Sequence, residues 1–531
     1  MPFLLHQLLT DGAERNPSQT AVVDTEGSLS YQELENLSNQ LAWELIASGV
    51  QPGDRVGLYL KKSRLAVAGI IAAQKAGATY VPVDPHAPAR RAAYILKNCS
   101  VHTLLISGDQ FTRLASDIPQ ITSLASLVRM DSRPNPLPAD FPPRLRVTWL
   151  AEVVSTQPSS LPDVPITDNH LAYILYTSGS TGEPKGVMIS HLNSLTFVNW
   201  CYDTFRVQPT DRVSNHAPLH FDLSIFDIFC TLKAGGTVFL VPEDTMLFPV
   251  EMARWIAESK ITIWYSVPSA LIQLVEHGHL EVHNYESLRT VLFAGEVFPI
   301  KYLRRLVKAL PRPRYFNLYG PTETNVCTFY EVQASDLDPG RTDPVPIGKA
   351  CANTEVCAVD EHLKPIRGGE EGELFVRSST VMKGYWGHPE GTAKGVIPNF
   401  LNPHYADVLY RTGDIVRLLP SGDYQYLGRK DKMIKSRGYR VELGEIEAAL
   451  YAHPGVREAA VTAVPHEELG ALIKAYVVAQ NGLSRADLER FCSQRLPRYM
   501  IPSWFEFCSE LPKTSTGKID KTRLEKEKIN V

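Results

Sequence analysis

A glycine- and hydroxyl-rich segment, YTSGSTGEPKG over residues 176–186, follows the apolar run LAYIL. A strand that ends in such a loop can hold a phosphate chain, because glycines let backbone N–H groups approach closely and hydroxyl side chains add donors. The spacing of a Walker loop, G-x-x-x-x-G-K-S/T, is absent, and a loop of this composition is more often a flexible connection. The segment alone therefore leaves both interpretations open.

Two charged residues could do chemistry, although each also has an ordinary structural explanation. Lys518 could stabilise the negative charge of a phosphoryl transfer, but it lies among Lys521, Lys526 and Lys528, as in a solvated tail. Asp222 could pair with an ammonium group, but it precedes the helix-like run LSIFDIF, where an aspartate often caps a helix. Taken alone, these residues favour the structural explanations.

The elements that must position these residues follow an α/β pattern. Apolar runs of strand length alternate with runs of helical periodicity. The predicted strands cover residues 54–60, 79–83, 236–241 and 261–266, and the predicted helices cover 63–76 and 251–260. This alternation predicts βαβ units and a mostly α/β architecture.

Local signals mark one further helix and one irregular connection. Ser30 and Glu33 have the spacing of a capping box, so a helix should begin there. It should bury Leu34, Leu37 and Leu41. Residues 131–165 are rich in proline, which cannot sustain regular hydrogen-bonded ladders, so we expect an irregular surface connection there.

Length and composition indicate a globular protein of two domains. The chain has 531 residues, of which 44% are hydrophobic and 21% charged, and a formal net charge of -4. This length exceeds the size at which a single core stops growing, and the sequence turns polar and basic near residue 428. We predict an α/β fold with a large domain of layered sheets and helices over residues 1–428 and a small α+β domain over 429–531. The charge gives no field suited to nucleic acid.

We expect neither a membrane segment nor a disulfide framework. The longest apolar stretch, residues 65–73, is too short to cross a bilayer. The opening residues lack a basic start and contain Asp11, so they predict an amphipathic surface helix rather than a signal peptide. The eight cysteines form no CxxC pair, which favours reduced thiols in a cytoplasmic protein.

Seven further motifs accompany the segment YTSGSTGEPKG along the chain. They are KAGATYVPVD (75–84), HFDLS (220–224), NLYGPTET (317–324), GELFVRSSTVMKGYW (372–386), YRTGD (410–414), GRKDKMIKSRGYRVELGEIE (428–447) and LPKTSTGKID (511–520). In this order they resemble the acyl-adenylate-forming superfamily, which includes nonribosomal peptide adenylation domains, acyl-CoA synthetases and luciferases. The resemblance covers nearly the whole chain and implies a small, mobile C-terminal domain that swivels about a hinge at Asp431.

The resemblance also implies ATP and Mg²⁺ as cofactors and assigns roles to individual residues. Lys518 matches the catalytic lysine, whose cation would lie between the acid and the α-phosphate. Glu323 matches the magnesium-binding glutamate, Tyr319 the ring that stacks on adenine, and Asp414 the acceptor of a ribose hydroxyl. The implied ATP-binding residues are Thr177, Ser178, Gly179, Ser180, Thr181, Gly182, Lys185, Gly295, Glu296, Asn317, Tyr319, Gly320, Thr322, Asp414, Tyr426 and Arg429.

The implied substrate is a small, uncharged amino acid. Asp222 matches the aspartate that pairs with the α-ammonium group of amino-acid substrates, which would otherwise be costly to bury. The other implied pocket residues carry no charge. They are Leu223, Phe226, Tyr265, Leu292, Ala294, Leu318, Val326 and Cys327. This set resembles that of stand-alone prolyl-adenylating enzymes, so we expect L-proline.

The resemblance further implies a discrete peptidyl carrier protein that bears phosphopantetheine, because no carrier serine motif follows Lys518. We interpret Lys430, Lys432, Lys435, Arg437 and Arg440 as a solvated charged face at the surface or domain interface. Alternatives are a ligase for D-alanine or another small amino acid, an acyl-CoA synthetase, and a catalytically silent binding homologue. Asp222 argues against most acyl-CoA ligases, and the intact motifs argue against a silent homologue.

Overall fold

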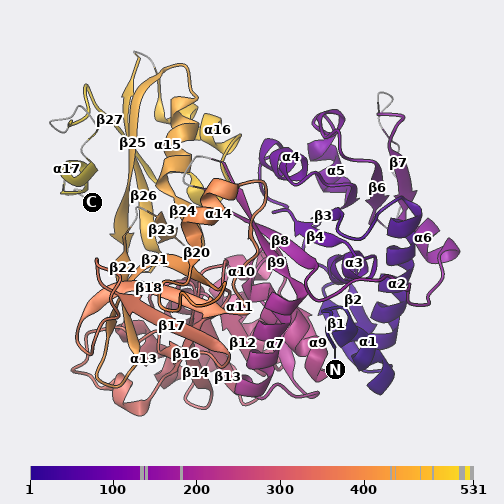
Figure 1. Ribbon diagram of the computed structural model, residues 1–531, viewed down its shortest axis with the longest axis horizontal. Helices are drawn as coiled ribbons and strands as arrows, with labels where there is room; N and C mark the ends of the chain where they lie inside the picture. Colours follow the sequence, from indigo (N-terminus) through magenta and orange to yellow (C-terminus); the bar gives the residue numbers. More distant parts are fainter. Residues whose placement is uncertain are drawn as a thin grey trace.

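The computed structural model describes residues 2–131, 137, 141–179, 183–430, 433–436, 438–466, 468–480, 483–513, 519 and 521–526. It has a large N-terminal domain of sheets and helices and a small C-terminal domain, which stands above the rest of the molecule on the left of Figure 1. The predicted mixed α/β fold class is confirmed.

The first long sheet has eight strands, and its central strands are parallel. In spatial order they are β19 (Gly384–Tyr385), β9 (Lys185–Ser190), β8 (Leu171–Thr177), β4 (Thr79–Pro82), β3 (Arg55–Tyr59), β5 (Thr103–Ile106), β6 (Ser126–Arg129) and β7 (Arg146–Trp149). Strands β8 and β9 form an antiparallel hairpin with the register Thr177 to Lys185. The two ends of the glycine-rich segment belong to this hairpin, because β8 ends at Thr177 and β9 begins at Lys185.

The second long sheet has nine strands, of which six are parallel. In spatial order they are β16 (Lys349–Ala350), β15 (Thr328–Glu331), β14 (Arg314–Tyr319), β13 (Thr290–Ala294), β12 (Ile263–Ser266), β10 (Arg212–Asn215), β11 (Thr237–Leu240), β1 (Thr20–Asp24) and β2 (Gly27–Ser30). The carboxyl ends of β12, β13 and β14 therefore lie side by side. In open parallel sheets, that edge is where ligands bind.

The two sheets share one hydrophobic core, with α3 (Arg64–Lys75) between them. Every α3 residue from Ala66 to Lys75 is buried, as expected for a helix that is apolar all round. At its end, Lys75 Nζ lies 2.7 Å from a carboxylate oxygen of Glu35 on α2 (Tyr31–Ala47). Lys75 Nζ also donates to Ser38 and Asn39, so a polar cluster links α2 to α3 inside the core.

Other helices cover the sheets or shape the site. They are α1 (Gln7–Arg15), α4 (Ala89–Asn98), α5 (Gly108–Leu114), α7 (His191–Phe205), α8 (Leu223–Ile225), the π-helical turn η2 (Phe226–Cys230), α9 (Thr231–Ala234), α10 (Glu243–Leu247), α11 (Pro249–Glu258), α12 (Pro268–His277), α13 (Ile300–Ala309) and α14 (Pro389–Gly395). Within the described part of the chain, no helix is long and apolar enough to cross a membrane.

The remaining strands form smaller sheets towards the C-terminus. An antiparallel sheet joins β17 (Thr354–Val359), β18 (Glu371–Ser378), β21 (Val408–Leu418), β20 (Val396–Pro398) and β22 (Tyr424–Arg429). The small domain contains the hairpin β23 (Met433–Ser436) and β24 (Tyr439–Glu442), the sheet β25 (Val456–His466), β26 (Gly470–Ala479) and β27 (Trp504–Phe507), and helices α15 (Leu443–Tyr451), α16 (Arg485–Ser493) and α17 (Lys521–Lys526). Its core, which includes Ile446 and Leu488, is separate from that of the large domain.

Most of the predicted elements are present within a few residues of their expected bounds. The capping box at the start of α2 is formed, because the Ser30 hydroxyl accepts from the Glu33 N–H and the Glu33 carboxylate accepts from the Ser30 N–H. Leu34 and Leu41 are fully buried, and Leu37 is partly buried.

The prediction of an irregular connection over residues 131–165 is wrong in its middle part. Residues 146–149 form β7 at the edge of the eight-stranded sheet, and α6 (Leu150–Thr156) follows at once. The prolines lie on either side of this proline-free run, so they do not interrupt its hydrogen bonds. The segment after it is held against α2, where Asn39 and Trp43 donate to the carbonyls of Ser159 and Ser160.

Candidate active site

Three cavities meet at Arg429, which lines each of them. The central cavity has a volume of about 100 Å³ and lies beyond the ends of β8, β12 and β13, where Met433, Lys435 and residues 438–440 of the small domain complete its lining. The tyrosine cavity, beside Tyr319 and Tyr426, has about 360 Å³. The basic cavity, beside Lys185 and Lys394, has about 400 Å³. Part of the lining of each cavity therefore comes from the small domain or from β22, the strand that precedes the small domain in the chain.

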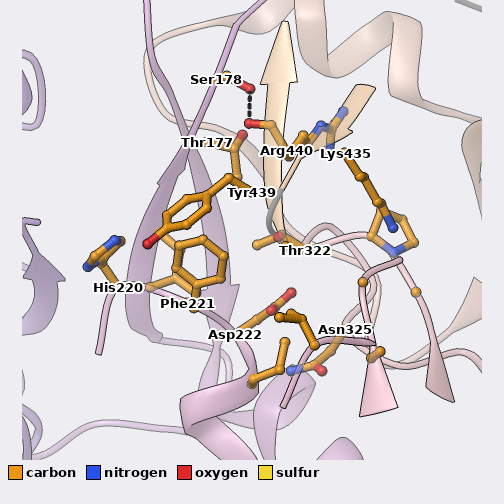
Figure 2. Close-up of a pocket in the computed structure, with 18 of the residues that line it drawn as sticks. Thr177, Ser178, His220, Phe221, Asp222, Thr322, Asn325, Lys435, Tyr439 and Arg440 are labelled. Carbon is orange, nitrogen blue, oxygen red and sulfur yellow. Dashed lines mark hydrogen bonds between the residues drawn. The ribbon is translucent and has the colours of Figure 1, made fainter. Parts of the chain in front are cut away.

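Asp222 faces the central cavity, and its carboxylate points towards Thr322 (Figure 2). Burial raises the pKa of Asp222, and a hydrogen bond from Thr322 and the charge of Lys435 partly offset that rise. Asp222 stands at the N-cap position of α8, but its side chain makes no capping hydrogen bond there. Among the described residues no salt bridge joins Asp222, which leaves this partly buried acid available to a cationic ligand.

The other predicted substrate residues are uncharged, and only part of that set reaches the central cavity. Leu223, Tyr265, Ala294 and Val326 line the central cavity together with Asp222. Three other predicted residues are fully buried outside its lining: Phe226, Leu292 and Cys327. Leu318 lines the tyrosine cavity instead.

Phe226 supports the wall from behind. Its ring meets that of Tyr265 edge to face, with centroids 5.6 Å apart, and that of Phe205 at 5.9 Å. Phe205 contacts Phe316 of β14 in turn, at 5.1 Å. Such aromatic contacts resist displacement, so Tyr265 cannot retreat easily and the cavity stays small.

The hairpin turn between β8 and β9 reaches two of the cavities. Thr177 and Ser178 line the central cavity, whereas Gly179 and Lys185 line the basic cavity. The Thr177 hydroxyl is buried without a hydrogen-bond partner among the described residues, and the Ser178 hydroxyl donates to the Arg440 carbonyl at 2.8 Å. The predicted ligands Ser180, Thr181 and Gly182 lie outside the described residues.

The carboxylate of Glu323 is fully buried, and its partners Arg440, Tyr385 and Lys185 line the central or the basic cavity. Arg440 Nη1 donates to both of its oxygens, at 3.0 and 2.9 Å, and the Tyr385 hydroxyl donates to one of them at 2.6 Å. Lys185 Nζ lies 3.9 Å away. Burial would raise the pKa of Glu323, but Arg440 and Lys185 outweigh it and lower the pKa to about 2. Glu323 is therefore ionised at neutral pH.

The tyrosine cavity gathers most of the residues predicted to contact the base and the ribose. The rings of Tyr319 and Tyr426 lie 6.3 Å apart, and Asn317, Gly295 and Glu296 complete that wall. Asp414, which lines the central cavity, accepts from the Tyr319 hydroxyl at 2.5 Å and from Arg429 at 2.8 Å. The last two predicted residues, Gly320 and Thr322, line the central cavity. A side chain at Gly320 would collide with the Asn325 carbonyl, since a Cβ there would lie 1.6 Å from its oxygen.

Of the predicted charged face at the surface or domain interface, the solvated part is wrong for Lys435 and Arg440. Both line the central cavity, and burial lowers the pKa of Lys435. Gly438 and Tyr439 between them also line it. The motif GRKDKMIKSRGYRVE marked this segment, but its local charge pattern could not show that the chain folds back over the site. Lys430 is exposed as predicted, whereas Lys432 and Arg437 lie outside the described residues.

Comparison with known proteins agrees with this geometry. Residues 9–386 match the model of the AMP-binding enzyme family, and residues 445–518 match that of the AMP-binding enzyme C-terminal domain. This protein is a member of the AMP-binding enzyme family. The resemblance predicted from the motifs is thereby confirmed, and family membership implies that ATP is used.

Two relatives within the AMP-binding enzyme family match over almost their full length. A ligase of L-proline with an L-prolyl-carrier protein from Pseudomonas fluorescens is 43% identical, with 99% of both chains covered. A ligase of the same name from Streptomyces coelicolor is 37% identical over 98% of this chain and 95% of its own. The solved structure of the amide bond synthetase McbA from Marinactinospora thermotolerans superposes with a TM-score of 0.85 and 25% identity, over 98% of this chain and 99% of that one.

Two residues predicted from the AMP-binding enzyme family, the lysine at 518 and the hinge aspartate at 431, lie outside the described residues. Described residues on either side of position 518 contact the small domain. Lys513 forms an isolated β-bridge with Ile519 and an ion pair with Glu458 of β25, and Lys521 forms an ion pair with Glu447 of α15.

The residues present fit a magnesium ion shared with a nucleotide. Glu323 offers two hard carboxylate oxygens, and Mg²⁺ is commonly held by one or two carboxylates together with substrate phosphates. Across the part of the chain that is described, no cluster of three acidic, histidine or cysteine ligands exists. An ion here would thus take its remaining ligands from the nucleotide and water.

Proposed function

We propose that this protein uses ATP to activate L-proline as its aminoacyl adenylate, with release of pyrophosphate, and then transfers the prolyl group to the thiol of a separate carrier protein. The observation that carries this proposal is Asp222, a partly buried acid without a salt-bridge partner among the described residues, beside a wall formed by the uncharged residues Leu223, Tyr265, Ala294 and Val326. Such a wall suits a compact apolar ring that carries one ammonium group. The names of the two relatives support the same substrate and acceptor.

Each cavity then has a role in the first step. The tyrosine cavity takes adenine beside Tyr319 and Tyr426, and Asp414 accepts a ribose hydroxyl. The hairpin turn between β8 and β9 holds the phosphates through its backbone N–H groups, its hydroxyls and Lys185. The central cavity takes proline, with the ammonium group on Asp222 and the carboxylate towards the α-phosphate.

The chemistry follows from this placement. The proline carboxylate attacks the α-phosphorus of ATP, the bond to the β-phosphate breaks, and pyrophosphate leaves with that electron pair. Lys518 stabilises the charge that gathers between the carboxylate and the α-phosphate, and holding both in line supplies much of the acceleration. Glu323 would hold Mg²⁺, which when bound neutralises phosphate charge.

The second step needs a different arrangement of the small domain. We propose that residues 429–531 form this domain and rotate about Asp431, so that Lys518 is used for adenylation and residues 438–440 for transfer. The thiol of the phosphopantetheine arm then attacks the prolyl carbonyl carbon, and AMP leaves as the mixed anhydride breaks.

Exchange of labelled pyrophosphate into ATP tests the first step. We expect proline to support exchange above all other proteinogenic amino acids, D-alanine, an aryl acid and a fatty acid. Lys518→Ala should abolish exchange, whereas Lys513→Ala, which removes a half-exposed cation paired with Glu458 on the small domain, should leave it intact. Exchange with another acid would overturn the substrate, and exchange with none would overturn the reaction.

A further inference from the structure

Arg440 brings a cation from the small domain onto a carboxylate of the large domain, 117 residues away in the chain. Glu323 is fully buried, and only 17% of the Arg440 side chain is exposed. One guanidinium nitrogen donates to both oxygens. The carboxylate that fits a metal ion is therefore already neutralised by an arginine.

The backbone around Arg440 is fixed at separate points of the large domain. The Gly438 N–H donates to a Glu296 oxygen at 2.5 Å, and the Arg440 carbonyl accepts from Ser178. The ring of Tyr439 meets that of Phe221 edge to face, with centroids 5.0 Å apart. Figure 2 shows Tyr439 and Arg440 above the central cavity, with the hydrogen bond to Ser178 marked. Residues 438–440 therefore dock at a defined position on the large domain, and we call this docked position the seat.

A divalent cation and the docked Arg440 would compete for the carboxylate of Glu323. The carboxylate carries one negative charge, and Arg440 uses both of its oxygens. A metal ion bound to the same oxygens would place like charges in contact in a buried site, where repulsion is only weakly screened. Lys185, 3.9 Å from Glu323, adds a further positive charge.

On the basis of the function proposed above, we propose that Arg440 and the divalent cation are alternative partners of Glu323. Residues 438–440 then seat over the site only after the metal has left with pyrophosphate, and Arg440 keeps the buried carboxylate paired during transfer. Arg440 is thus a positioning residue that ties the order of the two steps to one carboxylate.

Binding of Mn²⁺ alone to the full chain, followed by electron paramagnetic resonance, tests the competition. Removing the competitor raises the fraction of chains able to bind metal, and apparent affinity scales with that fraction. We expect Arg440→Gln to bind Mn²⁺ at least ~10-fold more tightly than wild type, Arg440→Lys to resemble wild type because a cation remains, and Glu323→Gln to lose this binding. Arg417→Gln, which removes a surface pair with Glu371, is the matched control.

A cross-link reports the seat itself. Gln273 on α12 donates to Glu468 of the small domain at 3.1 Å, so cysteines at these two positions should be joined by a short bifunctional thiol cross-linker when the domain is seated. Mn²⁺ should slow this reaction in the wild-type background and have no effect with Arg440→Gln. If Arg440 had a purely structural role, Arg440→Gln would slow the cross-linking reaction, and Mn²⁺ would still slow it further.

An Mn²⁺ affinity within about 2-fold of wild type in Arg440→Gln would overturn the competition, as would a cross-link that still responds to metal in that variant. If proline-dependent exchange is intact while either result holds, the proposed function stands and only the role of Arg440 fails. Absence of exchange in wild type would instead remove the function itself.

Discussion

Replacing Asp222 by asparagine should remove most of the preference for an amino acid over a carboxylic acid that has no ammonium group. The substitution keeps the shape of the side chain and an oxygen that can accept from Thr322, but removes the charge. At a separation of ~3 Å and an effective dielectric constant of ~20, an ammonium–carboxylate pair is worth about 5 kcal/mol. Breaking one partner of a buried pair costs about 3–5 kcal/mol, so kcat/KM for proline should fall by about two to nearly four powers of ten.

Pyrophosphate exchange measures this loss against two controls. Asp163→Asn changes an exposed aspartate and should not alter exchange. An analogue in which the ring nitrogen of proline is replaced by oxygen carries no ammonium group, so it should be equally poor with wild type and with Asp222→Asn. If Asp222→Asn retains proline-dependent exchange within about 3-fold, less than the ~1.4 kcal/mol of a tenfold change, Asp222 does not hold the ammonium group.

Three further predictions concern stability, pH and selectivity. Lys75→Met leaves Glu35 unpaired in the core and should lower the free energy of unfolding by about 3–5 kcal/mol in urea titrations; a loss below ~1 kcal/mol would show that this pair behaves like a surface one. Because the folded-state pKa of Glu323 is about 2 and its ordinary value 4.5, its stabilisation should be complete above about pH 4.5 and be lost as the pH falls towards 2; Glu323→Gln should flatten that part of the stability curve. Phe226→Ala removes the ring behind Tyr265 and should raise exchange with the six-membered-ring homologue of proline, relative to proline, by about 10-fold or more; an unchanged ratio would mean that Phe226 does not set the cavity size.

The parts of the fold that the sequence predicted are those specified by local pattern. The capping box at Ser30 and Glu33 and the alternation over residues 54–83 depend on neighbours in the chain, so they could be identified directly. Strand β7 and helix α6 were missed because the flanking prolines dominated the composition of residues 131–165. The pairing of β7 with β6 depends on the packing of the sheet, which local composition does not report.

The site shows the same division. Asp222 and Glu323 could be proposed as site residues because each lies within a short motif of fixed spacing. Arg440 was assigned to a solvated face because lysines and arginines cluster around it, and its partner is 117 residues away. Only the return of residues 438–440 over the ends of the strands makes that charge part of the site. The predicted roles of Leu292, Phe226 and Cys327 came from motif position, while the structure gives them no place in the cavity lining.

The aromatic and aliphatic support behind Asp222 has an evolutionary consequence. Phe226, Leu292, Leu318 and Cys327 belong to the same hydrophobic core that joins the two long sheets. Large-to-small changes at such positions cost about 2–5 kcal/mol, a considerable share of the roughly 5–15 kcal/mol by which a folded domain is stable. A lineage that acquires a larger substrate through these residues therefore needs stabilising substitutions first, whereas Leu223, which is only partly buried at the cavity surface, is open to earlier change.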